Sequence, residues 1–475
     1  MSSVSALDSL LSSSASSSSA INLSDILEAA LGASSAGINV NEAVSAGVTA
    51  AEAPETAWEN QESTLQSQTS ALQQIQTDAT NVDNDVQSLN SLTGPLSATT
   101  VTSSNSSIVT GSSVSGTAAG NTVVVVGNLA TTDTWASSAV SSSSAALPAG
   151  TVTITGPSGT PTTITVGSGV NTLSELATAI NGDNLGVTAN VITDASGALL
   201  TIQSDTSGSA GEFSVTSSAP TSFGFSEAVA GNNANLTVNG VAITSATNTV
   251  TGVVPGLTLN LLSASPGTQV TLGVSPNTSQ VSTAIQQFVS DYNTLITAVN
   301  AQYTDTGSGE GVLASDPTVN TLQSAILSAV DYTYTPASGT TTIPNLTSLG
   351  ISMNKDGTLS VDTATLNSVL ENNFSDVQSF FQGTSLNGFA NSVDQQLSTF
   401  LNPADGAFTV DLSGMSSQIS DLETDVTNFQ TNVIAPLQTQ LQSEYSKAEI
   451  ALQDLPNELK QIDAELGQNN NSSNG

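Results

Sequence analysis

Apolar residues recur at intervals of three and four near the C-terminal end of the chain, between residues 415 and 466. This spacing places one narrow apolar seam along a helix, and such a seam is normally buried against another helix. Pro436 marks a shift in the pattern and divides it into two runs. The first run consists of Met415, Ile419, Leu422, Val426, Phe429 and Val433. The second run consists of Leu437, Leu441, Tyr445, Ala448, Leu452, Leu455, Leu459, Ile462 and Leu466.

The same spacing occurs early in the chain. The apolar positions there are Trp58, Leu65, Leu72, Ile75, Ala79, Val82, Val86 and Leu89. Gly94-Pro95 ends this segment, because a residue before proline is disfavoured in the helical region. We expect the early and late segments to pack against each other, so that the two ends of the chain form one helical stalk.

Between about residues 96 and 275 the pattern changes to alternation, and Val, Thr, Ile and Gly become frequent. This change is typical of β-structure. Asn239-Gly240, between two alternating runs, predicts a tight hairpin turn. One helix interrupts the strands, with Thr172 as its N-cap and an end before Gly182.

Residues 276–414 return mainly to helical spacing. One helix is expected from Thr283 and a second after Asp316-Pro317. A compact hairpin is expected around Lys355-Asp356-Gly357. A further amphipathic helix is predicted from Leu366 to Phe381.

These patterns predict an α+β multidomain protein. An elongated helical coiled-coil stalk is formed by the N- and C-terminal segments, and β-rich head domains are inserted into it. The low-complexity start of the chain is expected to be disordered, apart from a transient helix around Leu23–Leu31. The expected organisation is a disordered arm at 1–36, an N-terminal arm and coiled-coil helix at 37–95, β-rich heads at 96–275, a helical and hairpin part at 276–414, a C-terminal coiled-coil helix at 415–466 and a disordered tail at 467–475.

The 475-residue chain has no Arg, His or Cys, only three Lys, and 39 acidic residues, which gives a formal net charge of -36. Nucleic-acid binding and anchoring to an anionic membrane both need basic side chains, so this composition argues against both. No apolar run reaches the length of a transmembrane helix, and we expect no membrane insertion. Met1–Ala20 has neither a basic residue nor a sustained apolar stretch, unlike a Sec-type signal peptide. The composition suits a soluble surface or secreted protein that is exported by another route.

The missing residue types exclude most catalytic and metal sites. Without His and Cys, the chain lacks the side chains for a Ser-His-Asp triad, a Cys-His dyad, or a zinc or haem site that depends on them. Without Arg, it lacks bidentate clamps for phosphate or carboxylate groups. We therefore expect no enzyme activity, no cofactor and no metal.

Three short motifs resemble functional sites but have simpler interpretations. Asp305-Thr306-Gly307-Ser308 resembles an aspartic-protease loop, yet that chemistry needs two such carboxylates, and only a homodimer would supply the second. The glycines at 307, 309 and 311 lack a preceding strand and a Walker lysine. Asn81, Asp83 and Asp85 resemble the first ligands of a calcium loop, but Val86 stands where that loop needs glycine. We interpret this last motif as a solvated helix face.

Eleven short stretches occur along the chain in an order that indicates a relation to a known protein family. The stretches are Gly37–Asn41, Ala51–Pro54, Leu65–Leu72, Asn128–Ala130, Thr172–Ala177, Gly186–Ala189, Leu236–Val241, Pro255–Leu259, Phe288–Asn293, Leu349–Ile351 and Asp356–Asp362. As a set they resemble the family of bacterial flagellar filament-capping proteins, also called hook-associated protein 2. The part at about 150–216 is similar to the small repeat found in flagellins and hook-associated proteins. The resemblance spans residues 37–466.

The resemblance implies an extracellular protein at the flagellum tip, exported through the flagellar type III apparatus and served by an export chaperone. Such a protein forms a homo-oligomeric ring that retains exported flagellin and promotes its folding and polymerisation into the filament. A role in cell adhesion is a further expectation from the resemblance. Flagellin and other copies of the chain are then its partners. The alternatives are another flagellar axial protein, such as a hook-filament junction protein, or a bacterial surface adhesin.

The residues expected to contact partners or other subunits come from the N-terminal signature and the two seams. They are Ile38, Val40, Val44, Trp58, Leu65, Leu72, Leu452, Leu455, Leu459, Ile462 and Leu466. The last five extend beyond the N-terminal seam, so we expect them to meet flagellin or a neighbouring subunit.

The shortage of basic residues suggests a protein that faces an acidic exterior. Few basic groups limit the positive charge that a chain acquires as its carboxylates are neutralised. Ready unfolding near pH 3 to 4, around the ordinary carboxylate pKa values, would contradict this hypothesis.

Overall fold

The computed structural model describes residues 39–219, 222–304, 309–336, 341–383 and 387–471, with the backbone alone at 463 and from 465 onward. The predicted N-terminal arm, 1–36, lies outside the described residues. Within the described part, the chain divides into two compact units. The first, here called the helical unit, contains the described residues up to Asn81, Tyr292–Ser328, and those from Gln395 onward. The second, here called the mixed unit, contains the described residues of Val82–Asp291 and Ala329–Asp394.

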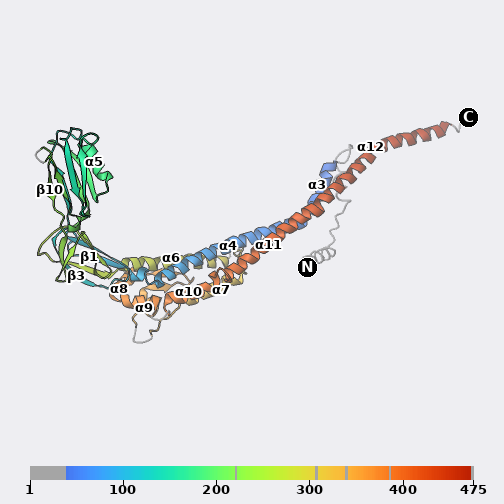
Figure 1. The fold of residues 1–475 in the computed structure, drawn as a ribbon. Coiled ribbons are helices and arrows are strands. Elements are labelled where there is room, and N and C mark those ends of the chain that lie inside the picture. Colours follow the sequence, from blue (N-terminus) through green and yellow to red (C-terminus); the bar gives the residue numbers. More distant parts are fainter. Residues whose placement is uncertain (1–38, 220–221, 305–308, 337–340, 384–386, 472–475) are drawn as a thin grey trace. The chain divides into compact units, whose positions relative to one another are not determined.

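Both ends of the chain contribute helices to the helical unit (Figure 1). The helices wholly or partly in it are α3 (Val40–Ala51), α4 (Ala53–Asn90), α6 (Thr278–Gln302), α7 (Pro317–Val330), α10 (Phe389–Leu401), α11 (Ala407–Phe429) and α12 (Ala435–Asn471). Asn39 is the N-cap of α3, because its side chain accepts a hydrogen bond from the backbone N–H of Glu42 at 3.3 Å. Both apolar seams recognised in the sequence therefore lie on helices.

The apolar seam of α4 is buried along most of the helix. Its fully buried positions form two interleaved sets with a seven-residue repeat. The sets are Leu72, Ala79 and Val86, and Ile75, Val82 and Leu89, each at most 1% exposed. The helix ends at Asn90, shortly before Gly94-Pro95, as the sequence predicted.

Pro436 coincides with a break in α-helical hydrogen bonding, where the sequence pattern also shifts. Proline has no backbone N–H, so it cannot donate to the carbonyl of Asn432, four residues earlier. A π-helical segment, η4 (Gln430–Ile434), occupies this position and joins α11 to α12. Beyond it, α12 continues through Pro456 to Asn471. Residues 467–471 are therefore helical, whereas we predicted a disordered tail from 467; residues 472–475 lie outside the described part.

The mixed unit contains two β clusters, each with its own apolar core. The first combines a five-stranded antiparallel sheet, ordered β1-β15-β3-β11-β12, with a three-stranded sheet, ordered β13-β14-β2. Its strands are β1 (Thr99–Ser103), β2 (Val109–Ser113), β3 (Gly120–Asn128), β11 (Ala234–Val238), β12 (Val241–Ser245), β13 (Thr249–Val254), β14 (Leu257–Leu261) and β15 (Val270–Pro276). Alternate residues of these strands, including Val124, Leu236, Leu259 and Leu272, fill the core.

The predicted Asn-Gly hairpin joins β11 to β12. Val238 pairs with Val241, so that only Asn239 and Gly240 form the turn. Their φ angles are 51° and 82°. Two consecutive positive φ values are those of a type I′ turn, whose twist matches that of the flanking strands.

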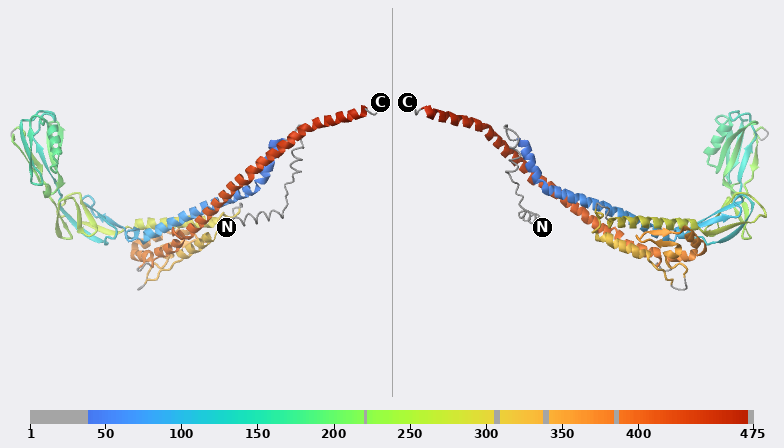
Figure 2. Two further views of the ribbon diagram at one scale, coloured as in Figure 1. Left: turned by 45° about the vertical axis from the view of Figure 1, so that its right-hand side comes forward. Right: turned by 180° about the vertical axis from the view of Figure 1, so that it is seen from behind.

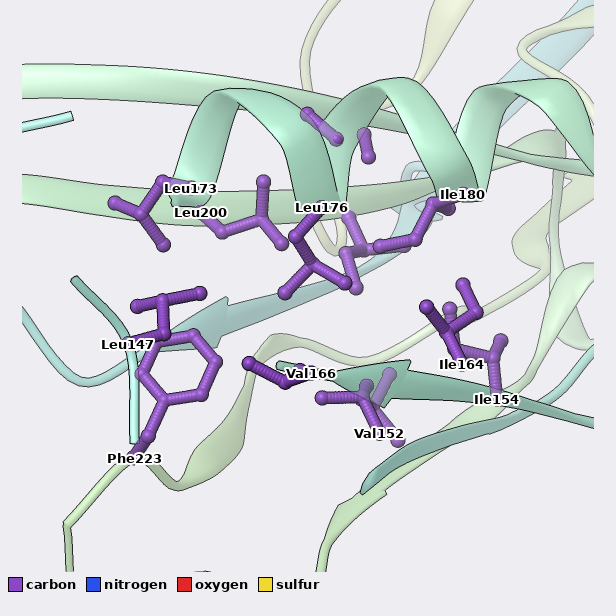
Figure 3. Close-up of a cluster of buried hydrophobic side chains, with 14 of the residues drawn as sticks. Leu147, Val152, Ile154, Ile164, Val166, Leu173, Leu176, Ile180, Leu200 and Phe223 are labelled. Atoms are coloured by element: carbon purple, nitrogen blue, oxygen red, sulfur yellow. The ribbon is translucent and has the colours of Figure 1, made fainter. Parts of the chain in front are cut away.

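The second β cluster is inserted between β3 and β11. It combines the sheets β10-β4-β8-β7 and β6-β5-β9 with helix α5 (Leu173–Gly182). Its strands are β4 (Thr132–Ser137), β5 (Gly150–Thr155), β6 (Pro161–Val166), β7 (Val187–Asp194), β8 (Gly197–Ser207), β9 (Ser214–Ser217) and β10 (Phe225–Val229). Figure 3 shows Leu173, Leu176 and Ile180 of α5 facing Val152 and Val166 across the core.

Helix α5 begins with the N-cap that the sequence predicted. The Thr172 hydroxyl accepts from the backbone N–H of Glu175 at 3.3 Å, and the Glu175 carboxylate accepts from the N–H of Thr172 at 3.1 Å. The same carboxylate accepts from the N–H of Asn171 at 2.9 Å. Backbone hydrogen bonding, first from Asn171, lowers the pKa of Glu175. This reciprocal arrangement is a capping box, which satisfies N–H groups that the first helical turn leaves without partners.

The predicted hairpin around Lys355 is present as β16 (Ile351–Met353) and β17 (Leu359–Val361). The single helix predicted from Leu366 to Phe381 is wrong, because the structure has two helices, α8 (Thr363–Asn372) and α9 (Phe374–Gln382). Asn373 separates them with φ -130° and ψ 30°, outside the helical region. Asn has a low helix propensity, and spacing of apolar residues alone does not reveal such a break.

None of the helices in the described ranges is both long enough and apolar enough to span a membrane.

Replacing the N-cap, Thr172→Ala, should destabilise the second β cluster by about 1 kcal/mol, because the backbone N–H of Glu175 loses its side-chain acceptor. Hydrogen exchange followed by mass spectrometry should show faster exchange in peptides that contain α5. Thr178→Ala is the matched control, because its hydroxyl bonds only to the carbonyl of Ser174 within the helix, at 2.9 Å. Equal effects of the two changes would show that the cap contributes nothing specific.

Candidate interaction surface

Helices α4 and α11 run antiparallel within the helical unit. Thr69 Oγ1 lies 3.7 Å from Met415 Sδ, and the rings of Trp58 and Phe429 meet edge to face with centroids 5.4 Å apart. Lower residue numbers on α4 thus meet higher numbers on α11. Figure 2 shows these two helices side by side from two further directions.

The pairing continues through η4 to α3 and α12. Glu55 is only 6% exposed, and its carboxylate accepts a hydrogen bond from the side-chain amide of Gln430. Further along, a Cβ placed on Gly47 would lie 2.8 Å from Cδ1 of Leu441. Glycine at this position therefore lets α3 approach α12 closely.

Beyond this contact, the described part of α12 carries five large apolar residues that remain exposed, Ile450 at 61% and four that continue the seam. Leu452, Leu455, Leu459 and Ile462 follow the three-and-four spacing, and their exposed fractions are 42%, 50%, 54% and 50%. At 3.6 residues per turn they lie on one side of the helix. We call these four residues the α12 strip. A contiguous exposed apolar surface of this kind is typical of an interaction site.

The structure places the predicted interface residues in three different settings. Leu65 and Leu72 are 8% and 0% exposed, so they belong to the core of the chain rather than to its surface. Val44 is buried, whereas Val40 and Trp58 are partly buried. Ile38 and the side chain of Leu466 lie outside the described residues. Of the predicted residues, the α12 strip is thus the group that the described structure leaves exposed.

Our interpretation of the Asn81, Asp83 and Asp85 motif as a solvated helix face is wrong for the two aspartates. Both are partly buried in the mixed unit. Burial, then the charge of Asp394, then a hydrogen bond with Asp394 raise the pKa of Asp83 to about 6. Burial, then a hydrogen bond with Asp291 and the charge of Asp291, raise the pKa of Asp85.

Sequence reasoning missed these carboxyl pairs because periodicity shows which face of a helix is apolar, but not which neighbour lies beside that face. One signal was available. The two aspartates lie between Val82 and Val86 of the buried seam, and residues next to a seam border the neighbouring helices.

The remaining motifs do not form a site in the described part of the chain. Asp305-Thr306-Gly307-Ser308 lies outside the described residues. Among the residues that the structure describes, no three or more acidic side chains are grouped to hold a metal ion.

Models of known protein families match most of this chain. The model for the N-terminus of flagellar hook-associated protein 2 matches residues 36–133, and the model for its C-terminus matches residues 231–457. The chain belongs to the flagellar hook-associated protein 2 family. This confirms the resemblance that the ordered motifs indicated. A third model, the flagellin hook IN motif, matches residues 151–206, which form β5, β6, α5, β7 and most of β8.

Individual members of the family give the same result. The B-type flagellar hook-associated protein 2 of Pseudomonas aeruginosa is 28% identical over 318 residues, which cover 60% of this chain and 65% of that protein. The lateral flagellar hook-associated protein 2 of Vibrio parahaemolyticus is 28% identical over 263 residues, covering 51% and 57%. The matches therefore span less than two thirds of the length of either relative.

The fold is similar to that of a solved member. The crystal structure of the D1-D2-D3 domains of the flagellar cap protein FliD from Escherichia coli superposes with a TM-score of 0.56 at 25% identity. The alignment covers 73% of this chain and 99% of that structure. The family match to the C-terminus ends at residue 457, so Leu452 and Leu455 of the α12 strip lie inside it, and Leu459 and Ile462 lie beyond it.

Removing the aromatic contact between α4 and α11, by Trp58→Ala, should destabilise this end of the helical unit by about 1 kcal/mol or more. Edge-to-face aromatic pairs contribute about 0.5–1.5 kcal/mol beyond the area they bury. Hydrogen exchange should increase in peptides around Trp58 and Phe429. Thr56→Ala is the control, because Thr56 is exposed and its hydroxyl bonds only to the carbonyl of Glu52. Unchanged exchange in the tryptophan variant would contradict a stabilising role for this pair.

Proposed function

We propose that this protein caps the flagellar filament. It forms an oligomeric structure at the tip that retains exported flagellin and promotes the folding and polymerisation of flagellin into the growing filament. The observation that carries the proposal is the match of both ends of the chain to hook-associated protein 2, supported by the similar fold of the Escherichia coli flagellar cap protein.

The helices from the two ends of the chain form a coiled-coil stalk in this proposal. Support comes from the seven-residue repeat of buried residues on α4 and from the antiparallel contacts of Trp58 with Phe429 and of Gly47 with Leu441. The β clusters are the head domains. The flagellin hook IN motif at 151–206 supports a relation between the inserted cluster and the axial proteins of the flagellum.

The α12 strip is the surface that meets flagellin or a neighbouring subunit. Full burial of a leucine or isoleucine contributes roughly 1.5–3 kcal/mol, so burying the exposed half of four such side chains contributes on the order of 3–6 kcal/mol. Ordering costs on association reduce this gain. The remainder suits a contact that forms during assembly.

The place of action in this proposal is the extracellular tip of the flagellum, reached through the flagellar export apparatus with the help of an export chaperone. The composition supports this location, because the chain has only three lysines, no arginine and a net charge of -36. Such a chain is poorly suited to nucleic acid or to an anionic membrane surface.

Deleting the gene from its host should abolish swimming and release flagellin monomer into the medium. Returning the wild-type gene should restore swimming and stop the release of flagellin. Swimming assays and immunoblots of the medium measure these outcomes. A surface adhesin would change neither property, so unchanged swimming and unchanged flagellin release would overturn the proposal.

The double substitution Leu459→Ser and Ile462→Ser should impair capping while the β clusters stay folded, because it removes two of the four apolar side chains of the strip without touching a buried residue. Complemented cells should swim poorly and lose flagellin to the medium. Circular dichroism of the purified variant should retain the wild-type β signal.

Gln461→Ser is the matched control, because Gln461 is exposed on the same turn but is not part of the strip. It introduces the same residue type into the same helix and should support normal swimming. Loss of the β signal in the double variant, or an equal defect in the control, would count against the strip as a partner contact.

A further inference from the structure

Two carboxyl pairs lie on opposite sides of the α4 seam within the mixed unit. At about 100° per residue, Asp83 and Asp85 fall on different sides of the line through Val82, Val86 and Leu89. Asp83 therefore borders one neighbouring helix and Asp85 another. The partner of Asp83 is Asp394 on α10, and the partner of Asp85 is Asp291 on α6.

A glutamine amide joins the first pair. Nε2 of Gln87 donates to Oδ2 of Asp83 at 2.8 Å and to Oδ1 of Asp394 at 2.9 Å. The other oxygen of Asp83, Oδ1, is buried and has no hydrogen-bond partner when both groups are treated as carboxylates. A shared proton between Asp83 and Asp394 would satisfy that oxygen.

The second pair also has a glutamine amide beside it, but this amide binds one carboxylate of the pair rather than both. Nε2 of Gln287, one turn before Asp291 on α6, donates to Oδ2 of Asp291 at 3.0 Å. Oδ2 of Asp85 is buried and has no hydrogen-bond partner when both groups are treated as carboxylates. In both pairs an uncharged amide stands where other proteins often place a cation.

The charged groups around each pair are acidic. Asp394 of α10 acts on Asp83, and Asp291 of α6 acts on Asp85, whereas Gln87 and Gln287 are neutral. The only cationic side chains of the chain are Lys355 in the β16–β17 turn and two lysines on α12. Two ionised carboxylates in such a partly buried pair repel each other, and sharing one proton removes that repulsion.

We propose that the Asp83–Asp394 and Asp85–Asp291 pairs form a proton-dependent clamp that holds α4 to α10 and α6 more firmly at acidic pH than at neutral pH. Each pair binds one proton more in the folded unit than in the unfolded chain. The clamp needs no ligand other than the proton and does not depend on the capping function.

The direction of the pH dependence follows from the pKa of Asp83, which burial and Asp394 raise from 3.8 to about 6. Because the folded state binds the proton more tightly, stability is greatest below about pH 4 for this group and falls as the pH rises toward 6. Asp85 acts in the same direction. Asp376 acts in the opposite direction, because hydrogen bonds from Thr342 lower its pKa and its contribution is lost in acid. The combined maximum of stability therefore lies at mildly acidic pH.

Hydrogen exchange of the full-length protein at constant ionic strength tests the clamp. Protection factors, which correct for the pH dependence of intrinsic exchange, are compared at pH 4.5 and pH 8 for peptides containing residues 82–90, 280–291 and 389–394. We expect about tenfold or greater loss of protection at pH 8, after allowance for the screening of partly exposed groups. Equal protection factors at the two pH values in the wild-type protein would by themselves overturn the proposal.

Two variants test the residues. Asp394→Asn and Asp291→Asn each replace one carboxyl by a neutral group of the same shape, so protection at pH 8 should rise and its pH dependence should shrink. Glu371→Gln, on the exposed face of α8, removes one charge elsewhere in the same unit and controls for net charge. An equal gain in the control, or an unchanged pH dependence in both aspartate variants, would contradict the clamp.

Discussion

Burial of the α4 seam is the interaction on which the helical parts of this protein depend. Helix α4 runs through both units: Leu72 lies in its part within the helical unit and Val86 in its part within the mixed unit. Both residues are fully buried. A fully buried leucine contributes about 1.5–3 kcal/mol, whereas an exposed ion pair contributes about 0–1 kcal/mol. With three lysines in the whole chain, ion pairs are also scarce. Apolar packing therefore decides how the N- and C-terminal segments come together.

Neutral hydrogen-bond donors take over the role that basic side chains have in most proteins. The amide of Gln430 satisfies the buried Glu55, and the hydroxyl and backbone N–H of Thr342 bind Asp376 at 2.5 Å and 2.9 Å. Amides and hydroxyls do not titrate in the physiological range, so these bonds change with pH only through the carboxylate. The hypothesis of an acidic exterior stays a prediction, because the hydrogen bonds of Thr342 to Asp376 lower the pKa of Asp376 and their contribution is lost in acid. The shortage of basic groups still limits the positive charge that the chain gains as its carboxylates are neutralised.

Much of the fold followed from local patterns. The heptad spacing located α4 and α11–α12, the Asn239-Gly240 pair located a hairpin, and Thr172 located the start of α5, because each signal acts within a few residues. The division of α8 from α9 at Asn373 and the carboxyl pairs did not follow. Asp83 resembles any exposed helix residue until α10 is known to lie beside it, and no spacing within one helix predicts that neighbour. For the surface, the length of the C-terminal seam indicated that its last turns would be left unpaired, and Leu459 and Ile462 are indeed half exposed.

The chain passes from the first β cluster into the inserted cluster and returns to the first cluster at a neighbouring point. Asn128 at the end of β3 pairs with Asn235 near the start of β11, so the two crossings of the chain lie side by side in one sheet. The sheet register there is set by β3 and β11 themselves rather than by the residues between them. The cluster is thus inserted at one place in the host sheet, and a change in its length leaves the pairing of β3 with β11 free to form as before.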